Sequence, residues 1–245
     1  MILKAALDML ISAVIPAFNE QVYLPATLSS LRDAISVCRC GTELIVVDNE
    51  SADRTREVAR SFGATVVHES VHNISRVRNA GASAARGDVL AFVDADTIVP
   101  RDFLERVAEA MGDPACVGGS ADIVHTPASK LLRVYLGVWR CLGMRLDMAQ
   151  GAAQFCRRSA FDLLKGYDES YFTGEDVDFY WRLRKLCAKS GGHLSFLDDV
   201  KVFPSPRRFD LTPAWRTLIW TNPAFIALFR KTRSAWWAWY VTTPR

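Results

Sequence analysis

The sequence lacks any run of about 18 uninterrupted apolar residues, the length that a helix needs to cross a membrane. It also lacks a strong charge of either sign, because 30 lysines and arginines stand against 27 acids. The net charge of +3 is too small to indicate a nucleic-acid partner. Intrinsic disorder is excluded because 50% of the residues are hydrophobic. A chain of 245 residues with this composition is expected to form one large domain or two small ones.

Side chains that bind soft metals are few and poorly spaced for a metal site. Of the six cysteines, only Cys38 and Cys40 lie close together, and a C-x-C spacing alone is weak evidence for a metal. We therefore expect reduced thiols in a cytoplasmic protein. The four histidines have no ligand-like spacing and are expected to be ordinary surface or loop residues: His68, His72, His125 and His193.

The N-terminal segment lacks the charge pattern of a signal peptide. Lys4 supplies one positive charge, but Asp8 interrupts the apolar run that follows it. The run then continues without a break into Pro16 and the polar residues after it. We therefore expect no cleaved signal and a cytoplasmic location.

What the sequence does contain is an alternation of short apolar runs with segments of helical period. The expected strands span residues 11–15, 43–47, 64–67 and 89–93, and the expected helices span residues 24–35, 53–62, 75–85 and 100–111. This alternation predicts right-handed crossovers and a mostly parallel, doubly wound α/β sheet. The strands are continuously apolar, which indicates that helices cover both faces of the sheet.

The second half of the chain has a different pattern. We expect an amphipathic helix over residues 126–150, a turn at 166–168 and a helix that begins with Glu175 and Asp176. Further strands are expected at residues 194–197 and 200–203. Residues 211–245 are expected to be helical and interrupted, and they contain five of the seven tryptophans.

Polar residues follow three of the expected strands at the points where those strands end. The three clusters are Pro16–Glu20, Asp48–Ser51 and Asp94–Asp96. In such sheets ligands bind beyond the carboxyl ends of the strands, so one crevice should collect all three clusters. Each cluster taken alone could instead be an Asx turn or a helix cap.

Two acids one residue apart at a strand end can present oxygen atoms to a hard divalent cation. Asp94 and Asp96 would suit Mg²⁺ or Mn²⁺, with substrate phosphates completing the coordination shell. The phosphate-binding sequence G-x-x-x-x-G-K-[ST] is absent. Phe18 is a candidate surface for stacking a base, and Asp48 is a candidate acceptor for a base N–H. Together these residues describe a nucleotide-diphosphate site.

Four segments in this order carry a family resemblance: VIPAFNE, VVDNESADRT, RNAGASAARGDVLAFVDADT, and GYDES followed by TGEDVDFYWRL. They resemble glycosyltransferase family 2 across residues 11–185. The resemblance implies the GT-A fold, an α/β doubly wound sheet flanked by helices, here with a C-terminal helical segment. Family members use nucleotide-activated sugars, usually with Mg²⁺ or Mn²⁺, and invert the configuration at the anomeric carbon.

The resemblance also implies roles for individual residues on the donor side. The loop that cradles the nucleotide corresponds to Pro16, Ala17, Phe18, Asn19 and Glu20. Asp48 corresponds to the acid that binds the base, with Ser51 in the same loop, and Arg78 and Asn79 correspond to a polar pair beside the nucleotide.

The acidic motifs also correspond to family motifs. Asp94 and Asp96 match the DxD motif, in which Asp96 resembles the metal ligand and Asp94 resembles the contact to the ribose and the metal shell. Glu175 and Asp176 match the "ED" pair, in which the aspartate acts as general base. A positioned carboxylate can accept the proton of the acceptor hydroxyl as that hydroxyl attacks.

Two departures from the common pattern affect what the resemblance implies. No histidine lies between Val200 and Phe209, where many GT-A enzymes place a further metal ligand. Arg207 or Arg208 could contact the diphosphate instead, or these arginines could form a basic surface turn. The Q-x-x-R-W sequence of processive synthases is also missing, which favours a single transfer over polymerisation.

The resemblance implies a catalytic domain over residues 1–210, with a nucleotide-binding half at 11–111 and an acceptor half at 112–210. The expected donor is a UDP-linked sugar, and the expected acceptor is a saccharide or a lipid-linked saccharide. The tail at 211–245 either packs on the sheet or lies on the inner face of the membrane, where tryptophan and arginine suit the interface.

Two other functions remain open at this point. A nucleotidyltransferase would normally show a glycine-rich loop with lysine or arginine after the first strand, where this chain has PAFNE. A non-catalytic sugar-nucleotide binder is disfavoured because Asp96 and Asp176 are both present.

Overall fold

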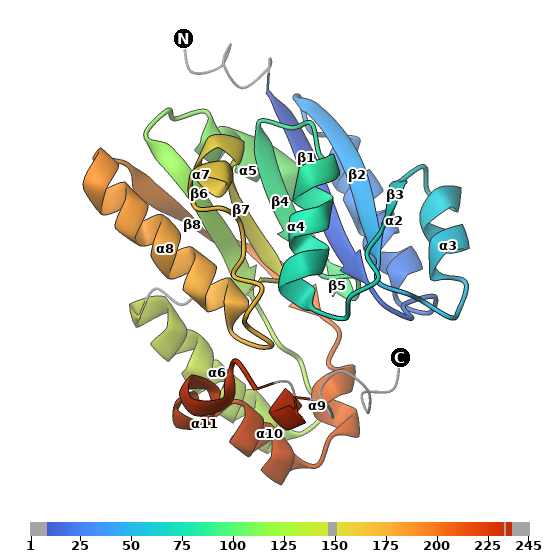
Figure 1. The fold of residues 1–245 in the computed structure, drawn as a ribbon, viewed down its shortest axis with the longest axis vertical. Coiled ribbons are helices and arrows are strands. Elements are labelled where there is room, and N and C mark those ends of the chain that lie inside the picture. Colours follow the sequence, from blue (N-terminus) through green and yellow to red (C-terminus); the bar gives the residue numbers. More distant parts are fainter. Residues whose placement is uncertain (1–8, 147–150, 233, 237–245) are drawn as a thin grey trace.

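An eight-stranded β-sheet forms the centre of the structure, which is a computed structural model describing residues 9–146, 151–232 and 234–236. The strands follow the spatial order β3-β2-β1-β4-β7-β6-β8-β5, with helices on both faces (Figure 1). The strands are β1 (Leu10–Ala17), β2 (Gly41–Asp48), β3 (Thr65–His68), β4 (Val89–Val93), β5 (Thr97–Ile98), β6 (Cys116–Ile123), β7 (Ala153–Arg157) and β8 (His193–Pro204). The helices are α2 (Leu24–Ile35), α3 (Thr55–Ser61), α4 (Ile74–Ala84), α5 (Phe103–Met111), α6 (Lys130–Arg145), α7 (Arg158–Leu163), α8 (Glu175–Ser190), α9 (Arg207–Leu211), α10 (Ala214–Trp220) and α11 (Pro223–Phe229).

The first four strands form the parallel half of the sheet, as the sequence predicts. β1 pairs in parallel with β2 and β4, and β2 pairs in parallel with β3. Every residue of β4 is buried, because α2 and α5 pack on one face of the sheet while α4, α7 and α8 pack on the other. The expected helices of this half are confirmed, with ends that differ by a few residues.

α4 approaches the parallel half of the sheet closely at Gly81. A Cβ atom at this position would meet the side chain of Val14 in β1 and would lie 2.7 Å from Cγ2 of Val47 in β2. Both valines are buried, so neither can move away without disturbing the core. The glycine therefore fixes the distance between α4 and the sheet, and with it the position of Arg78 one turn earlier.

Gly81→Ala should lower the free energy of unfolding by about 1–3 kcal/mol, because the added methyl group overpacks the interface between α4 and the sheet. Urea denaturation followed by circular dichroism measures this change. Gly137→Ala is the matched control, since no atom lies within 4 Å of a Cβ atom there. The control should leave stability unchanged or raise it by up to about 1 kcal/mol, because alanine favours a helix interior. Equal effects of the two changes would show that Gly81 is not a packing requirement.

The second half of the sheet contains strands that the sequence analysis does not predict. β7 runs antiparallel to both β4 and β6, whereas β6 and β8 are parallel, so the sheet as a whole is mixed. β5 pairs antiparallel with the end of β8. The two strands expected at 194–197 and 200–203 are one strand, β8, whose register with β6 shifts between the pairs Ala121–Leu197 and Asp122–Lys201.

Two glycines explain why β6 does not look like a strand in the sequence. A Cβ atom at Gly118 would lie 2.5 Å from the carbonyl oxygen of Phe155 in β7, and one at Gly119 would meet the carbonyl group of Ser195 in β8. Glycine is normally unfavourable in a strand interior, but it is needed where a neighbouring backbone comes this close.

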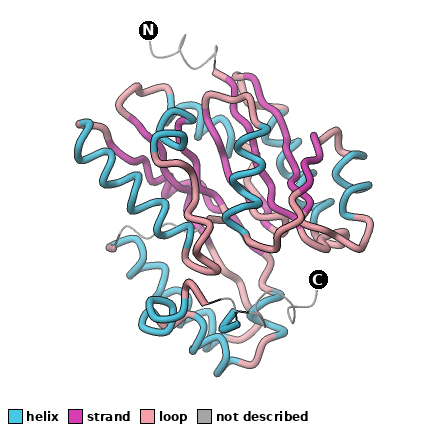
Figure 2. The backbone as a smooth tube through the Cα atoms, in the orientation of Figure 1, coloured by secondary structure: helices cyan, strands magenta, loops and turns pink. Residues whose placement is uncertain are grey.

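A separate helical layer lies beyond the carboxyl edge of the parallel strands. It consists of α6 and the last three helices, which gather below the sheet in Figure 1 and stand apart from the strands in Figure 2. α6 begins at Lys130, later than the expected residue 126, because Ser129 caps it: the Ser129 hydroxyl accepts a hydrogen bond from the Leu132 N–H. The remainder of the expected helix, residues 147–150, lies outside the described residues.

The expected interrupted helices of the tail are confirmed where the structure describes them. Pro213 directly precedes α10 and Pro223 begins α11, positions at which the missing proline N–H costs nothing.

The tryptophans of the tail differ in burial. Trp236 is fully buried and its ring N–H donates to the Phe229 carbonyl at 2.8 Å, whereas Trp215 is exposed. Residues 237–245, with the last two tryptophans, lie outside the described part of the chain. Within the described part, no helix is both long enough and apolar enough to cross a membrane.

Candidate active site

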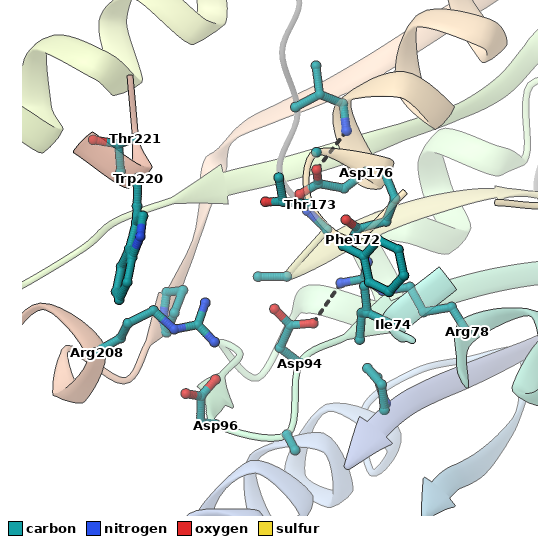
Figure 3. Close-up of a pocket in the computed structure, with 18 of the residues that line it drawn as sticks. Ile74, Arg78, Asp94, Asp96, Phe172, Thr173, Asp176, Arg208, Trp220 and Thr221 are labelled. Carbon is teal, nitrogen blue, oxygen red and sulfur yellow. Dashed lines mark hydrogen bonds and ion pairs between the residues drawn. The ribbon is translucent and has the colours of Figure 1, made fainter. Parts of the chain in front are cut away.

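A cavity of about 660 Å³ lies between the carboxyl edge of the sheet and the helical layer. Most of the residues expected in the site line it, and Figure 3 shows several of them facing one another across the open space. The expected residues that line it are Pro16, Ala17, Phe18, Glu20, Arg78, Asp94, Asp96, Glu175, Asp176, Arg207 and Arg208. The single crevice expected from the strand order is therefore present.

Asp94 and Asp96 occupy the turn between β4 and β5. The Asp94 carboxylate accepts a hydrogen bond from Nη2 of Arg78 at 2.9 Å, and the Asp96 carboxylate lies 3.1 Å from Nη2 of Arg207. Burial raises the pKa of Asp96, while the positive charge of Arg207 acts in the opposite direction. These contacts each engage one carboxylate oxygen.

A divalent cation at this turn would need ligands from outside the protein. No group of three histidine, cysteine or acidic side chains suited to a metal occurs among the described residues. Asp94 and Asp96 nevertheless offer hard oxygen ligands, and Mg²⁺ and Mn²⁺ commonly complete their shells with phosphate oxygens and water. The donor set therefore fits a metal that binds together with a diphosphate.

Arg78 joins the acidic turn to the start of α8. Its guanidinium is buried between Asp94 and Glu175, where Nη1 donates to the Glu175 carboxylate at 2.6 Å. Burial disfavours the charged form, but the two carboxylates outweigh it and raise the pKa of Arg78. A Cβ atom at Gly151 would lie 2.5 Å from Nη2 of Arg78, so glycine is required beside the guanidinium.

Glu175 and Asp176 form the first turn of α8, where the helix dipole stabilises negative charge. The chain enters this turn through Gly174, whose φ of 69° is a left-handed conformation that glycine adopts without strain. The Asp176 carboxylate accepts hydrogen bonds from the N–H groups of Gly151 and Val177, both at 2.7 Å. Burial raises the pKa of Asp176, which makes this carboxylate a stronger base than an exposed one.

Glu175 should titrate well above the usual range of glutamates. Burial and the neighbouring charge of Asp176 raise its pKa from 4.5 to about 7, although Arg78 acts in the opposite direction. The folded protein holds this proton more tightly than the unfolded chain does. The stabilisation from that proton is therefore complete below pH 4.5 and is lost as the pH rises through about 7.

Carbon-13 NMR of the glutamate side chains checks this expectation. One carboxyl signal should titrate near pH 7, and Glu175→Gln should remove it. The control Glu57→Gln, on the exposed first turn of α3, should leave that signal in place. The assignment fails if the high-pH signal survives in Glu175→Gln.

Phe18 lies against a polar partner that the sequence analysis treats as an ordinary histidine. Its ring is tilted against the His72 ring at 4.7 Å between centroids, and Nδ1 of His72 lies 3.3 Å from Oδ1 of Asn49. All three residues line the cavity. An aromatic face beside an amide and an imidazole is suited to bind a nucleobase.

Four expected site residues are not among the cavity residues: Asn19, Asp48, Ser51 and Asn79. Asp48 is fully buried, and its carboxylate accepts from Nε of Arg56 at 2.5 Å and from the Ser51 N–H at 3.3 Å. The Ser51 hydroxyl accepts from the Asn19 N–H at 2.9 Å, which ties together the loops after β1 and β2. These contacts fix the two loops that carry Phe18 and Asn49.

Asn79 faces the loop after α7. Its side chain accepts a hydrogen bond from the Tyr167 N–H at 2.9 Å and donates to the Tyr167 carbonyl at 3.0 Å. The same Tyr167 donates its hydroxyl proton to Oε1 of Gln154, whose Nε2 donates to the backbone carbonyl of Asp176. Asn79 and Gln154 thus hold the entrance to α8 in place. Gln154 is a positioning residue that the sequence does not reveal.

Arg207 and Arg208 lie at the start of α9, after the end of β8. Arg207 forms ion pairs with Glu20 and Asp96 and lies over the ring of Tyr23 at 4.2 Å, so it is not part of a surface turn. Its Nη1 is buried and makes no hydrogen bond to any described residue. Arg208 points toward Asp94 and Asp96 in Figure 3. Burial lowers the pKa of Arg208 below its usual value, although the charges of the two acids act in the opposite direction.

Aromatic and basic side chains from the second half complete the cavity. They are His125 after β6, Trp139 of α6, Phe172, Trp220 of α10 and Arg230 after α11. His125 lies in a loop, as expected, and packs edge-on against Phe209 at 5.1 Å beside the cavity. The helices that carry Trp139 and Trp220 are expected from the sequence, but their placement against the sheet is not, so the sequence does not bring these side chains to the site.

The chain matches known proteins along most of its length. It matches a family profile described as Glycosyl transferase family 2 over residues 12–156. The pre-mycofactocin glycosyltransferase of Mycobacterium tuberculosis is 30% identical over 198 residues, covering 73% of this chain and 40% of that protein. The glycosyltransferase AglE of Haloferax volcanii is 24% identical over 203 residues, covering 78% of this chain and 65% of that protein. The chain therefore spans only part of the length of these relatives.

Solved structures share the fold. The mannosyltransferase PcManGT from Pyrobaculum calidifontis, in complex with GDP-Man and Mn²⁺, has a TM-score of 0.66 and 20% identity, covering 85% of this chain and 60% of that chain. The glucosyl-3-phosphoglycerate synthase of Mycobacterium tuberculosis, with Mn²⁺, UDP and glucosyl-3-phosphoglycerate, has a TM-score of 0.64 and 18% identity, covering 94% of this chain and 82% of that chain.

Proposed function

Because the chain belongs to glycosyl transferase family 2, we propose that it transfers a sugar from a nucleotide-diphosphate donor to an acceptor hydroxyl by a single inverting displacement. One observation carries the proposal: Asp94, Asp96, Asp176 and Arg208 face a common cavity of about 660 Å³ in the GT-A fold. The cavity offers carboxylates for a metal, arginines for a diphosphate and a buried carboxylate for proton transfer.

The donor would lie across the carboxyl ends of β1 and β4. The base would lie against Phe18, His72 and Asn49, and we propose a UDP-linked sugar as the donor. The diphosphate would reach the acidic turn, where a bound Mg²⁺ or Mn²⁺ would stabilise the charge that develops on the leaving group. The unpartnered Nη1 of Arg207 and the guanidinium of Arg208 are suited to the phosphate oxygens.

The acceptor hydroxyl would attack the anomeric carbon from the side of Asp176. In this displacement the acceptor oxygen forms a bond to the anomeric carbon as the bond to the diphosphate breaks, and the hydroxyl proton moves to Asp176. The hydrogen bonds from Gly151 and Val177 orient that carboxylate, and its raised pKa helps it to take the proton. Glu175 is bound to the buried Arg78, so we assign it a positioning role beside the base.

The described tail contributes to the same cavity through Trp220 and Arg230. We propose that residues 1–210 form the catalytic domain and that residues after 210 close its acceptor side. The acceptor would be a saccharide or a lipid-linked saccharide in the cytoplasm, in keeping with six cysteines that are all free thiols.

A screen of nucleotide sugars tests the proposal against its two alternatives. The full chain is incubated with each donor in Mn²⁺, in Mg²⁺ or in a chelator, and released nucleoside diphosphate is measured. We expect one donor to release its nucleoside diphosphate in a metal-dependent reaction. Release of pyrophosphate would instead indicate a nucleotidyltransferase, and donor binding without any release would indicate a non-catalytic binder.

A further inference from the structure

α6 has apolar residues on two of its faces, and only one of these faces is covered. Leu132 and Leu136 are buried, and Trp139 faces the cavity from the same side of the helix. On another side, Leu131 and Val138 are 72% and 63% exposed. The positions 131, 134, 138 and 142 recur at helical spacing, so their side chains form a single exposed apolar stripe.

The neighbouring helix α10 also exposes apolar residues. The two helices are joined by a hydrogen bond of 2.7 Å between the Tyr135 hydroxyl and the Thr221 hydroxyl. α10 exposes Trp215, Leu218 and Ile219. We call the exposed apolar residues of both helices the outer face of the helical layer: Leu131, Val134, Val138, Leu142, Trp215, Leu218 and Ile219. Isolated exposed apolar residues are common, but a contiguous group of them marks an interaction surface.

Most of the charges around the outer face are positive, although the exposed Asp210 accepts a hydrogen bond from the Ala128 N–H at 2.8 Å near the start of α6. Lys130 and Arg133 are exposed at the start of α6, and Arg145 and Arg216 are exposed further along the layer. The sequence contains no aspartate or glutamate in residues 126–146 or 211–236. An apolar helical surface with tryptophan, bordered mostly by cations, complements the interface of an anionic bilayer, where rings and cations are both favoured.

We propose that the outer face docks on an anionic lipid bilayer, with α6 and α10 lying in the plane of the headgroups. An adjacent side of α6 lines the cavity through Trp139, so the cavity lies within about one helix diameter, 10–12 Å, of the bilayer. An acceptor sugar carried on a lipid headgroup can enter the cavity at this distance while its lipid remains in the membrane. This last step rests on the proposed function, whereas the docking itself does not.

Flotation of the full chain with lipid vesicles tests the docking. The protein should float with vesicles that contain phosphatidylglycerol, not with phosphatidylcholine alone, and high salt should weaken the binding. Leu131→Ser/Val138→Ser should reduce vesicle partitioning about tenfold or more. The matched control Val22→Ser/Leu163→Ser, at residues 63% and 67% exposed elsewhere, should leave it unchanged.

Charge variants test the electrostatic part separately. Lys130→Gln and Arg133→Gln should each weaken binding to phosphatidylglycerol vesicles about fivefold at low salt. Lys189→Gln, in the last turn of α8, is the control and should have no such effect. The docking proposal is overturned if the intact chain does not float with phosphatidylglycerol vesicles at low salt. It is also overturned if the outer-face variants and their controls bind the vesicles equally well.

A second copy of the chain is the alternative occupant of the outer face. Light scattering would then show a dimer that Leu131→Ser/Val138→Ser converts to a monomer, and this result would also overturn the membrane proposal. UDP binding by calorimetry keeps the two proposals apart. If the protein floats with vesicles but binds no nucleotide with or without Mn²⁺, the proposed function is wrong and the docking stands.

Discussion

Replacing Asp176 by asparagine should lower kcat by about 10²–10⁴-fold while UDP binding stays within a small factor of the wild type. The change removes the group that takes the acceptor proton but leaves the size of the side chain unchanged. It does not alter Asp94, Asp96 or the arginines, which are the groups proposed to bind the diphosphate. The loss should therefore fall on the chemical step.

Asp176→Asn also changes a structural contact, and the experiment must account for it. The carboxylate accepts hydrogen bonds from Gly151 and Val177 on different oxygens, and an asparagine side chain has only one oxygen to replace them. Thermal unfolding of the variant measures this cost, and calorimetry with UDP shows whether the cavity is intact. Asp162→Asn is the control, at an exposed aspartate of α7 that does not line the cavity.

The measured reaction should be sugar transfer with a saturating donor, analysed for kcat and KM separately. The Asp162→Asn control should retain most of the wild-type kcat. If Asp176→Asn transfers sugar at close to the wild-type rate, Asp176 is not the base, and Glu175 becomes the candidate. NMR of the purified product gives a second check, since an α-linked donor should yield a β-linked product.

Asp96→Ala should abolish the gain in UDP affinity that Mn²⁺ provides and should lower turnover by about 10²–10³-fold or more. In the wild type, the carboxylate would hold the cation that binds the diphosphate oxygens, so affinity and leaving-group stabilisation both depend on it. The variant also removes an acceptor from Arg207, which keeps its ion pair with Glu20. In Asp96→Ala, Glu20 should therefore still hold the Arg207 guanidinium in the cavity wall.

Calorimetric titration of UDP, with Mn²⁺ and with a chelator, separates the metal effect from this change in Arg207. Without metal, the wild type and Asp96→Ala should bind UDP with similar affinity, and only the wild type should improve when Mn²⁺ is added. The exposed Asp102→Ala serves as the control and should behave as the wild type. An unchanged response to Mn²⁺ in Asp96→Ala would remove Asp96 from the metal site.

The parallel half of the fold could be predicted because its sequence signals are local. β4 is a run of five buried apolar residues, and the acids that follow it fall at the end of the strand by chain direction alone. The same reasoning brings Asp94 and Asp96 to the sheet edge. It also places Glu175 and Asp176 at the first turn of α8.

The mixed half could not be predicted, because its strands depend on contacts between distant segments. β6 contains Gly118 and Gly119, which weaken any local strand signal and are explained only by the close backbones of β7 and β8. β7 buries Gln154, a polar residue that is tolerated because Tyr167 and the Asp176 carbonyl satisfy its amide. Without these strands, the positions of His125 and Trp139 in the cavity could not be derived.

The ion pair between Arg207 and Glu20 joins side chains that are 187 positions apart. On the ribosome, β1 to β4 leave the exit tunnel well before residue 207, but the eight strands form one sheet and a domain generally folds as a unit. The proposed diphosphate contacts of Arg207 and Arg208 can form only after these residues have also left the tunnel. A nucleotide that binds the proposed site would therefore favour the closing of the helical layer over the sheet only in the last stage of synthesis.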